Sequence, residues 1–276
     1  MKFPGKWKLR KSPAQDETPY VSERHGVRTL HIGSDTVQSA MRLARPNDLE
    51  LSYTRSMMGF MLFMEPPGDV LMIGLGGGSL AKYIYHHLPG TRIKAVELSP
   101  DVVAIARHYF HLPADDRRFE VVVGDGSEYV RRADVSADVV IVDGYDSDAH
   151  AEELASPDFY EACHNRLRCG GMLVVNLWGG DRLFRTLSRR IETAFPAGTL
   201  CLPAERPGNV IVFGFRNDPG PLKWASLEER AQGLEKTFGG LEYPRFTGAL
   251  RKMNRHDAEF VYPRGALRAD AGAGFS

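Results

Sequence analysis

Apolar runs alternate with amphipathic segments from residue 70 onward, and glycine, proline or charged residues separate them. Short continuous apolar runs of this kind predict buried strands. The predicted strands are 70–73, 92–98, 119–123, 138–142 and 171–177. Helical periodicity fills the intervals between them. The predicted helices are 80–88, 100–110, 128–132, 157–167 and 181–195.

Two more strands follow without a helix between them. They span 199–202 and 210–215, and Pro207, Gly208 and Asn209 form a turn signal between them, so we expect an antiparallel pair. Buried strands separated by helices predict a parallel sheet with helices on both faces. The fold class is therefore α/β: a doubly wound, mostly parallel, seven-stranded Rossmann-like sheet.

The first fifty residues predict a short β region, with strands at 20–24 and 27–32 around a turn at His25-Gly26. It follows a basic tail. A helix is expected over 51–63, before Pro66-Pro67-Gly68.

The C-terminal region predicts a helical segment with a frayed end. Ser226 and Glu229 have the spacing of a capping box, which predicts a helix from there to about Phe238. The expected organisation is thus a β region over 1–50, a nucleoside-binding catalytic domain over 51–216 and a helical segment over 217–276.

Composition narrows the function class. The chain has 276 residues, with 35 basic and 35 acidic side chains, and this zero net charge gives no sign of a nucleic acid or membrane partner. No apolar run is as long as a membrane span. Three cysteines, Cys163, Cys169 and Cys201, do not make a disulfide framework, and we expect a reduced, cytoplasmic protein. No set of side chains has metal-ligand spacing, so no metal is predicted.

A glycine loop follows the first buried strand and precedes a helix. It reads Gly74-Leu75-Gly76-Gly77-Gly78. Glycines allow a sharp turn and close approach of a ligand, and the helix N-terminus adds N–H donors. The loop predicts a nucleotide-type site, although a glycine-rich turn without a ligand has the same appearance.

Acidic residues end the next two strands. Glu97 lies 19 residues after Gly78, where it can accept both ribose hydroxyls. Asp125, followed by Gly126, can accept from an exocyclic amine such as that of adenine. The alternative for a single acid of this kind is a helix N-cap. A dinucleotide could use the first two features, but the third suits a ligand with one nucleoside.

Two further carboxylates follow the fourth strand. Asp143 ends it and Asp146 lies three residues later. Carboxylates beside a nucleoside site suggest an amine partner, which is protonated at neutral pH with a pKa of about 10.4. A carboxylate can take that proton as the amine attacks. The alternative is that Asp143 caps a loop and Asp146 is solvated.

Together these motifs resemble the spermidine synthase family of aminopropyltransferases. The resemblance runs from Tyr53 to about Phe215 and is carried by Val70–Gly74, Val96–Leu98, Gly124–Gly126 and the Asp143…Asp146…Phe159-Tyr160 pattern. It implies a class I methyltransferase-like sheet that binds decarboxylated S-adenosylmethionine as co-substrate and transfers its aminopropyl group to a small-molecule amine, a diamine. A homodimer is also expected.

The resemblance assigns roles to individual residues. Asp143 is the implied catalytic base, while Asp146, with Tyr53 and Tyr145, is implied to bind the acceptor. Gly74, Gly76, Gly77, Gly78, Glu97, Asp125 and Gly126 are implied to bind the donor, Glu97 through its ribose and Asp125 through its adenine.

The loop departs from the family pattern at one position. The family has an aspartate that contacts the amine of the donor tail, and this chain has Gly77 there. A glycine would not repel the carboxylate of ordinary S-adenosylmethionine, which keeps a methyltransferase open as an alternative. A nucleoside-binding protein without turnover is the third reading.

Overall fold

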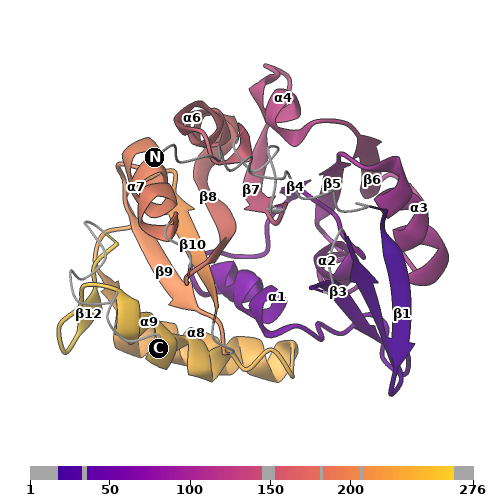
Figure 1. Ribbon diagram of the computed structural model, residues 1–276. Coiled ribbons are helices and arrows are strands. Elements are labelled where there is room, and N and C mark those ends of the chain that lie inside the picture. Colours follow the sequence, from indigo (N-terminus) through magenta and orange to yellow (C-terminus); the bar gives the residue numbers. More distant parts are fainter. Residues whose placement is uncertain (1–17, 33–35, 145–152, 181–182, 206–207, 264–276) are drawn as a thin grey trace, which may run out of the picture.

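The computed structural model describes residues 18–32, 36–144, 153–180, 183–205 and 208–263 (Figure 1). Tyr145 and Asp146 lie outside these ranges, as does the basic N-terminal tail.

A seven-stranded sheet forms the centre of the molecule, with the strand order β6-β5-β4-β7-β8-β10-β9. The first five of these pair in parallel, and β10 is antiparallel to both of its neighbours. This order confirms the predicted mostly parallel sheet with an antiparallel final pair. The strands are β4 (Asp69–Ile73), β5 (Arg92–Glu97), β6 (Phe119–Val123), β7 (Ala137–Val142), β8 (Leu167–Trp178), β9 (Thr199–Pro203) and β10 (Asn209–Phe215).

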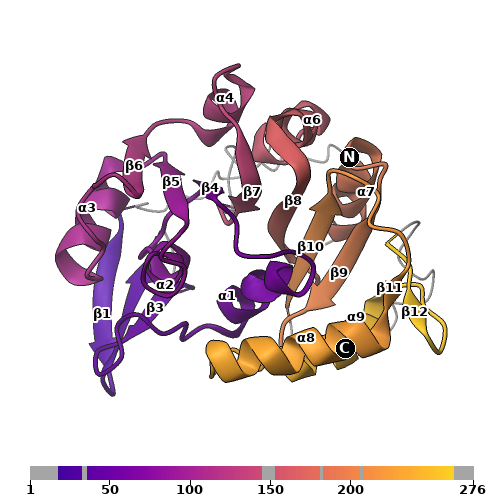
Figure 2. The same ribbon diagram turned by 180° about the vertical axis from the view of Figure 1, so that it is seen from behind.

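Helices cover both faces of the sheet (Figures 1 and 2). One apolar cluster joins one face to α1 (Ser52–Met57), α2 (Ser79–His87), α3 (Pro100–Tyr109), α8 (Trp224–Thr237) and α9 (Tyr243–Met253). A second cluster joins the other face to α4 (Gly126–Arg131), α6 (Pro157–Arg166) and α7 (Phe184–Ala194). Both faces are therefore buried, which explains why the parallel strands read as continuous apolar runs.

The N-terminal region is a three-stranded antiparallel sheet, with β1 (Tyr20–Arg24), β2 (Val27–His31) and β3 (Val37–Arg42). It packs against α3 through an apolar cluster of Leu30, Met41, Val102 and Phe110. The strand β3 was not predicted. Its Gln, Ser and Ala residues have little strand propensity, and its burial comes from pairing with β2 and contact with α2.

The helix expected over 51–63 is in fact two shorter elements. The α-helix α1 stops at Met57, and a 3₁₀ helix, η1 (Met58–Leu62), continues the chain. Gly59 lies in η1, where an added Cβ would come within 3.0 Å of Leu202 and 3.1 Å of Phe213. Close packing against the sheet accompanies the tighter turn.

The predicted capping box at Ser226 is wrong. The helix α8 begins earlier, at Trp224, and no side chain caps it. Trp224 is 3% exposed, and its backbone N–H and indole N–H donate to the carbonyls of Glu259 and Asp257. This buried anchor fixes the start of the helix and leaves Ser226 inside the first turn. The following helix α9 and the small sheet of β11 (Leu222–Lys223) and β12 (Phe260–Val261) were not predicted.

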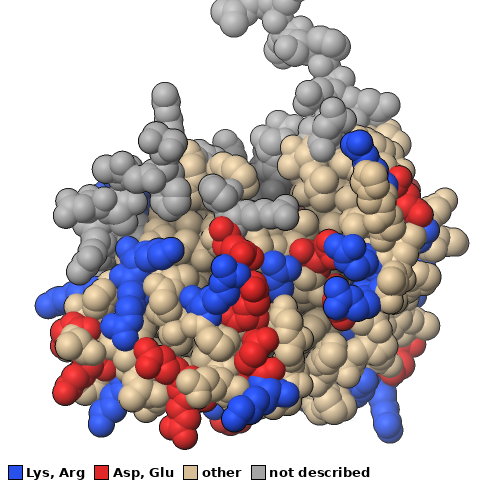
Figure 3. All heavy atoms as spheres, turned by 90° about the horizontal axis from the view of Figure 1, so that it is seen from below, with Lys and Arg blue, Asp and Glu red and all other residues tan. Residues whose placement is uncertain are grey.

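Acidic and basic side chains are interspersed on the face seen in Figure 3. This distribution agrees with the balance of charges in the sequence. Among the described residues, no helix is both long enough and apolar enough to cross a membrane.

Candidate functional site

The carboxyl ends of β4 and β7 meet at the centre of the sheet, and this junction positions Asp143. The Asp143 N–H donates to the carbonyl of Ile73 over 2.9 Å. Gly74, which follows Ile73, has φ +92°, and a Cβ there would overlap the Asp143 carbonyl oxygen. Only glycine allows the two backbones to approach this closely. The first residue of the glycine loop, Gly74, is therefore in backbone contact with Asp143.

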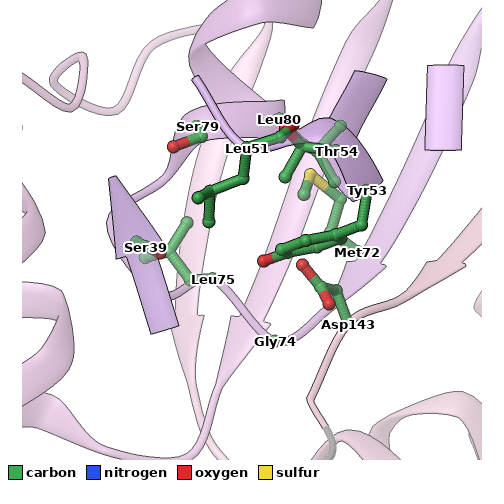
Figure 4. A pocket seen from close by; sticks show the side chains of 10 residues that line it. All are labelled: Ser39, Leu51, Tyr53, Thr54, Met72, Gly74, Leu75, Ser79, Leu80 and Asp143. Atoms are coloured by element: carbon green, nitrogen blue, oxygen red, sulfur yellow. The ribbon is translucent and has the colours of Figure 1, made fainter. Parts of the chain in front are cut away.

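Side chains from two other elements flank Asp143. Asn176 on β8 donates its amide N–H to Oδ1 over 2.9 Å. The Tyr53 hydroxyl on α1 lies beside the same carboxylate in Figure 4 and donates to the Gln38 carbonyl over 3.3 Å. Asn209 on β10 adds a further hydrogen bond to this series, because its side-chain amide donates to Asn176 Oδ1 over 3.0 Å. Neither asparagine was predicted, and their alignment depends on strand pairing that local patterns do not reveal.

Burial raises the pKa of the Asp143 carboxyl, and the Asn176 amide and the Tyr53 hydroxyl partly offset this rise. The pKa of Tyr53 lies well above its ordinary value, through burial first and the nearby Asp143 charge second. Tyr53 is therefore a neutral donor. A carboxyl with a raised pKa is a better proton acceptor than an ordinary aspartate.

The glycine loop packs closely against the N-terminal sheet and α3. The Gly77 N–H donates to Ser39 Oγ on β3 over 2.8 Å. A Cβ on Gly77 would lie 2.8 Å from Cδ1 of Phe110 and 3.0 Å from the Cβ of Ser39. Contacts under 3.0 Å require a neighbour to move, so this position has no room for a side chain. The packing of Phe110 and Ser39 around Gly77 thus leaves no space for the aspartate that the family has at this position.

A buried lysine holds these elements together. Lys82 on α2 is 1% exposed, and its ammonium donates to the carbonyls of Phe110 and Pro46, over 2.6 and 2.7 Å, and to Sδ of Met41 over 3.2 Å. Burial lowers its pKa to about 8. Sequence reasoning missed Lys82, because a lone lysine in an amphipathic helix predicts a solvated side chain.

Glu97 lies at the end of β5 beside the loop. Its Oε2 accepts the Leu75 N–H over 2.9 Å, and its Oε1 accepts the Ser99 N–H over 3.0 Å. Each carboxylate oxygen has a further lone pair. The carboxylate is therefore oriented by backbone on both sides and can still accept from a ligand hydroxyl.

Asp125 caps the helix α4. Its Oδ1 accepts from the N–H groups of Ser127, over 2.6 Å, and Glu128, over 3.4 Å. Despite partial burial, these bonds lower its pKa. Asp125 is therefore the N-cap of α4, which was the alternative to a ligand contact. Contact with adenine stays a prediction, for the Oδ2 atom. Gly126 begins α4 and packs on Ile73.

A pocket joins some of the predicted site residues (Figure 4). Its lining combines the loop, the end of β7, α1 and β3. The lining residues are Ser39, Leu51, Tyr53, Thr54, Met72, Gly74, Leu75, Ser79, Leu80 and Asp143. The structure thus brings Tyr53, Gly74 and Asp143 together in the pocket. Glu97 accepts from the backbone of the lining residue Leu75, and neither Glu97 nor Asp125 lines the pocket itself.

Comparisons with known proteins identify one enzyme family. The family described as "Spermine/spermidine synthase domain" matches residues 50–209. The polyamine aminopropyltransferase of Chromobacterium violaceum is 41% identical over 254 residues, which are 91% of this chain and 97% of that protein. The eEF1A lysine and N-terminal methyltransferase of Xenopus laevis is more distant, with 28% identity over 186 residues, 63% of this chain and 27% of that protein.

The fold is similar to that of solved structures. A crystal structure of spermidine synthase in complex with the transition state analogue AdoDATO superimposes with a TM-score of 0.64 at 21% identity. The match covers 84% of this chain and 83% of that one.

Proposed function

The chain belongs to the spermine/spermidine synthase family, and we propose that it transfers the aminopropyl group of decarboxylated S-adenosylmethionine to a small-molecule amine. The observation that carries the chemistry is the Asp143 carboxylate. It lies in one pocket with the glycine loop, and burial raises its pKa. The methyltransferase relatives are only distant, which favours aminopropyl transfer.

Asp143 is the proposed base. An alkylamine has a pKa of about 10.4, so removing its proton at pH 7 costs roughly 4–5 kcal/mol. As the amine nitrogen bonds to the aminopropyl carbon next to sulfur, the bond from that carbon to sulfur breaks. Its electron pair stays on sulfur, which becomes a neutral thioether, and the amine proton passes to Asp143. Asn176 holds the carboxylate in place for this transfer, and Tyr53 lies beside it.

The remaining roles concern binding. Glu97 is proposed to hold the ribose and Asp125 the adenine, beside a backbone cradle formed by Gly74, Gly76, Gly77, Gly78 and Gly126. Tyr53, Tyr145 and Asp146 are proposed to contact the acceptor. The donor is already electrophilic at the carbons bonded to sulfur, so the protein supplies orientation and a base.

A methyltransferase is the second candidate, and the specific observation for it is Gly77. Without an aspartate at this position, the loop does not repel the carboxylate of ordinary S-adenosylmethionine.

Product analysis tests both candidates. The purified protein is incubated with each donor and a panel of amines, and the nucleoside product is identified by mass. Methylthioadenosine is the expected product. S-adenosylhomocysteine instead would establish methylation, and tight binding with neither product would establish a binding protein.

A further inference from the structure

We propose that Arg230 and Tyr243, on the C-terminal helices α8 and α9, are positioning residues for Tyr53. They hold the segment formed by α1 and η1, and this segment sets where the Tyr53 ring stands beside Asp143. The inference rests on the proposed function, in which Tyr53 contacts the acceptor, and deepens it. Both C-terminal helices lie next to the segment in the two ribbon views and share an apolar cluster with it (Figures 1 and 2).

The segment that carries Tyr53 has little stability of its own. The helix α1 has six residues, and no side chain caps its start at Leu51. The 3₁₀ helix η1 has five residues and also lacks a side-chain cap. Isolated helices of this length do not form stably in water, because few hydrogen bonds offset the cost of ordering the chain. Contacts from other elements must therefore fix the orientation of Tyr53.

Arg230 on α8 caps the end of this segment. Its guanidinium donates from Nε to the carbonyl of Met61 over 2.6 Å and from Nη2 to the carbonyl of Met64. The last carbonyls of a helix have no partner within the helix, and an arginine side chain can supply the donors. Glu65 accepts from Nη1 over 2.6 Å, but its side chain is 84% exposed, so this ion pair adds little. Arg230 thus acts chiefly through backbone carbonyls.

Tyr243 on α9 holds the junction between α1 and η1. Its side chain is fully buried, and its hydroxyl donates to the carbonyl of Met58 over 3.2 Å. Met58 is the first residue of η1 and follows α1 directly. A buried hydroxyl that lost this acceptor would be left unpaired at a cost, so the bond constrains both partners. Tyr243 therefore ties α9 to the backbone at the end of the helix that carries Tyr53.

A series of ion pairs also runs from α9 to α1. Arg245 on α9 donates to Oε1 of Glu205 over 2.8 Å, and Arg55 on α1 lies 3.5 Å from Oε2 of the same carboxylate. Arg245 and Glu205 are both substantially exposed, so water and salt weaken these pairs. The stronger links are the bonds from Arg230 and Tyr243 to backbone carbonyls, and these two residues are the ones to test.

Tyr243→Phe and Arg230→Met remove the two sets of hydrogen bonds, and turnover is measured with the donor and amine that product analysis identifies. We expect kcat/KM to fall about fivefold or more in each variant, since a small displacement beside the reacting atoms is costly. Affinity for methylthioadenosine should stay within about twofold, because the glycine loop and Glu97 belong to other elements. Arg230→Lys keeps a cationic donor and should recover part of the loss.

Two matched controls remove similar groups from neighbouring positions. Tyr83→Phe deletes a buried hydroxyl on α2 that has no hydrogen-bond partner among the described residues. Arg251→Met deletes a guanidinium that joins α9 to α8 instead of to η1, through Glu228 at 3.3 Å and the ring of Trp224 at 3.9 Å. Both controls should keep kcat/KM within about twofold of the wild type.

A double-mutant cycle separates positioning from general stability. In a Tyr53→Leu background, a residue that acts through Tyr53 has nothing left to position. The losses in kcat/KM should therefore shrink to less than about twofold, while the change in melting temperature caused by Tyr243→Phe stays the same in both backgrounds. Equal activity losses in the two backgrounds would overturn the positioning role.

Fluorine NMR with fluorotyrosine in place of Tyr53 reports on the ring without turnover. Its resonance should shift or broaden in Tyr243→Phe and Arg230→Met and stay unchanged in Tyr83→Phe and Arg251→Met. An unchanged resonance in the first two variants would overturn the inference even if turnover falls. If decarboxylated S-adenosylmethionine gives no turnover but the resonance responds as expected, the positioning role stands and the proposed function falls.

Discussion

The side-chain amide of Asn176 donates a 2.9 Å hydrogen bond to Oδ1 of Asp143, across the parallel pair β7 and β8. This bond favours the charged carboxylate, whereas burial favours the neutral carboxyl. The pKa of the proposed base is therefore set by two opposing effects. Asn176 fixes the direction in which its lone pairs point, while burial keeps it basic.

Asn176→Ala removes the bond and should raise the pKa of Asp143 further. The acid limb of the kcat/KM profile is then expected at higher pH, since the base must lose its proton before it acts. Loss of the bond also lets the carboxylate turn away from the amine, and a misplaced catalytic group costs up to about 10²-fold in rate, so kcat should fall roughly tenfold or more. Asn209→Ala leaves the Asn176–Asp143 bond in place and serves as the control. Superimposable pH profiles for Asn176→Ala and wild type would contradict the positioning role.

Asp143→Asn should abolish the proton transfer, with a loss in turnover of about 10²-fold or more, and leave donor affinity within a few fold. The stability effect has the opposite sign. The pKa of Asp143 is raised in the folded state, so the folded protein holds this proton more strongly than the unfolded chain does. The group therefore lowers the free energy of unfolding as pH rises from the ordinary aspartate pKa to the raised pKa of the folded state. The variant should therefore unfold at an equal or higher temperature at pH 7. Its advantage should shrink toward acid pH in thermal melts, and retained turnover would exclude Asp143 as the base.

The sheet and the Asp143–glycine loop pair were predictable because each depends on local signals. Continuous apolar runs identify buried strands, and residues that follow such strands share one edge of the sheet. Asn176, Asn209 and Ser39 were not predictable in the same way. Each acquires its role from a partner at least 33 positions away along the chain. Strand register and the docking of β3 decide these contacts.

Asp125 shows a second limit of sequence reasoning. A strand-end aspartate followed by a helix is compatible with a ligand contact and with an N-cap, and the residue types are the same for both. The structure contains the cap. Trp224 shows a third limit, since a tertiary anchor moved the start of α8 away from the capping pattern at Ser226.

Glu97→Ala should weaken donor binding by about 1–3 kcal/mol in calorimetry, because charge-assisted hydrogen bonds to the ribose are lost. It should also lower the free energy of unfolding, since the N–H groups of Leu75 and Ser99 lose their acceptor. Glu97→Gln retains one carbonyl oxygen and should recover part of both effects. A drop in stability with unchanged donor affinity would assign Glu97 to the loop alone.

Gly77→Asp tests whether the loop aspartate of the family fits this chain. Its Cβ would lie 2.8 Å from Phe110 and 3.0 Å from Ser39, so we expect a destabilisation of about 1–3 kcal/mol and no gain in affinity for decarboxylated S-adenosylmethionine. Gly90→Asp is a matched control, because no atom lies within 4 Å of its added Cβ. Urea unfolding and calorimetry measure the two effects. A tighter donor complex in Gly77→Asp would show that the neighbours yield.

Lys82→Met removes a buried charge with little change in shape. The pKa of Lys82 is about 8 in the fold and 10.5 in its ordinary state, so below pH 8 the protein pays roughly 3 kcal/mol to keep this ammonium buried. The unfolded chain binds more protons between these two values, and the free energy of unfolding should therefore rise with pH there. The variant lacks this rise, while its loss of hydrogen bonds to the carbonyls of Pro46 and Phe110 does not depend on pH.

The informative quantity is the difference in unfolding free energy between wild type and Lys82→Met, measured by urea titration from pH 7 to 10.5. Tyr83 and the buried cysteine thiols also have raised pKa values, and their titration destabilises both proteins alike at high pH. These contributions cancel in the difference, which should grow in favour of the wild type as pH increases. A flat difference would mean that Lys82 binds its proton equally well in the folded and unfolded chain. The contribution of Lys82 to holding α2 against the carbonyls of Pro46 and Phe110 would then depend on packing rather than on charge.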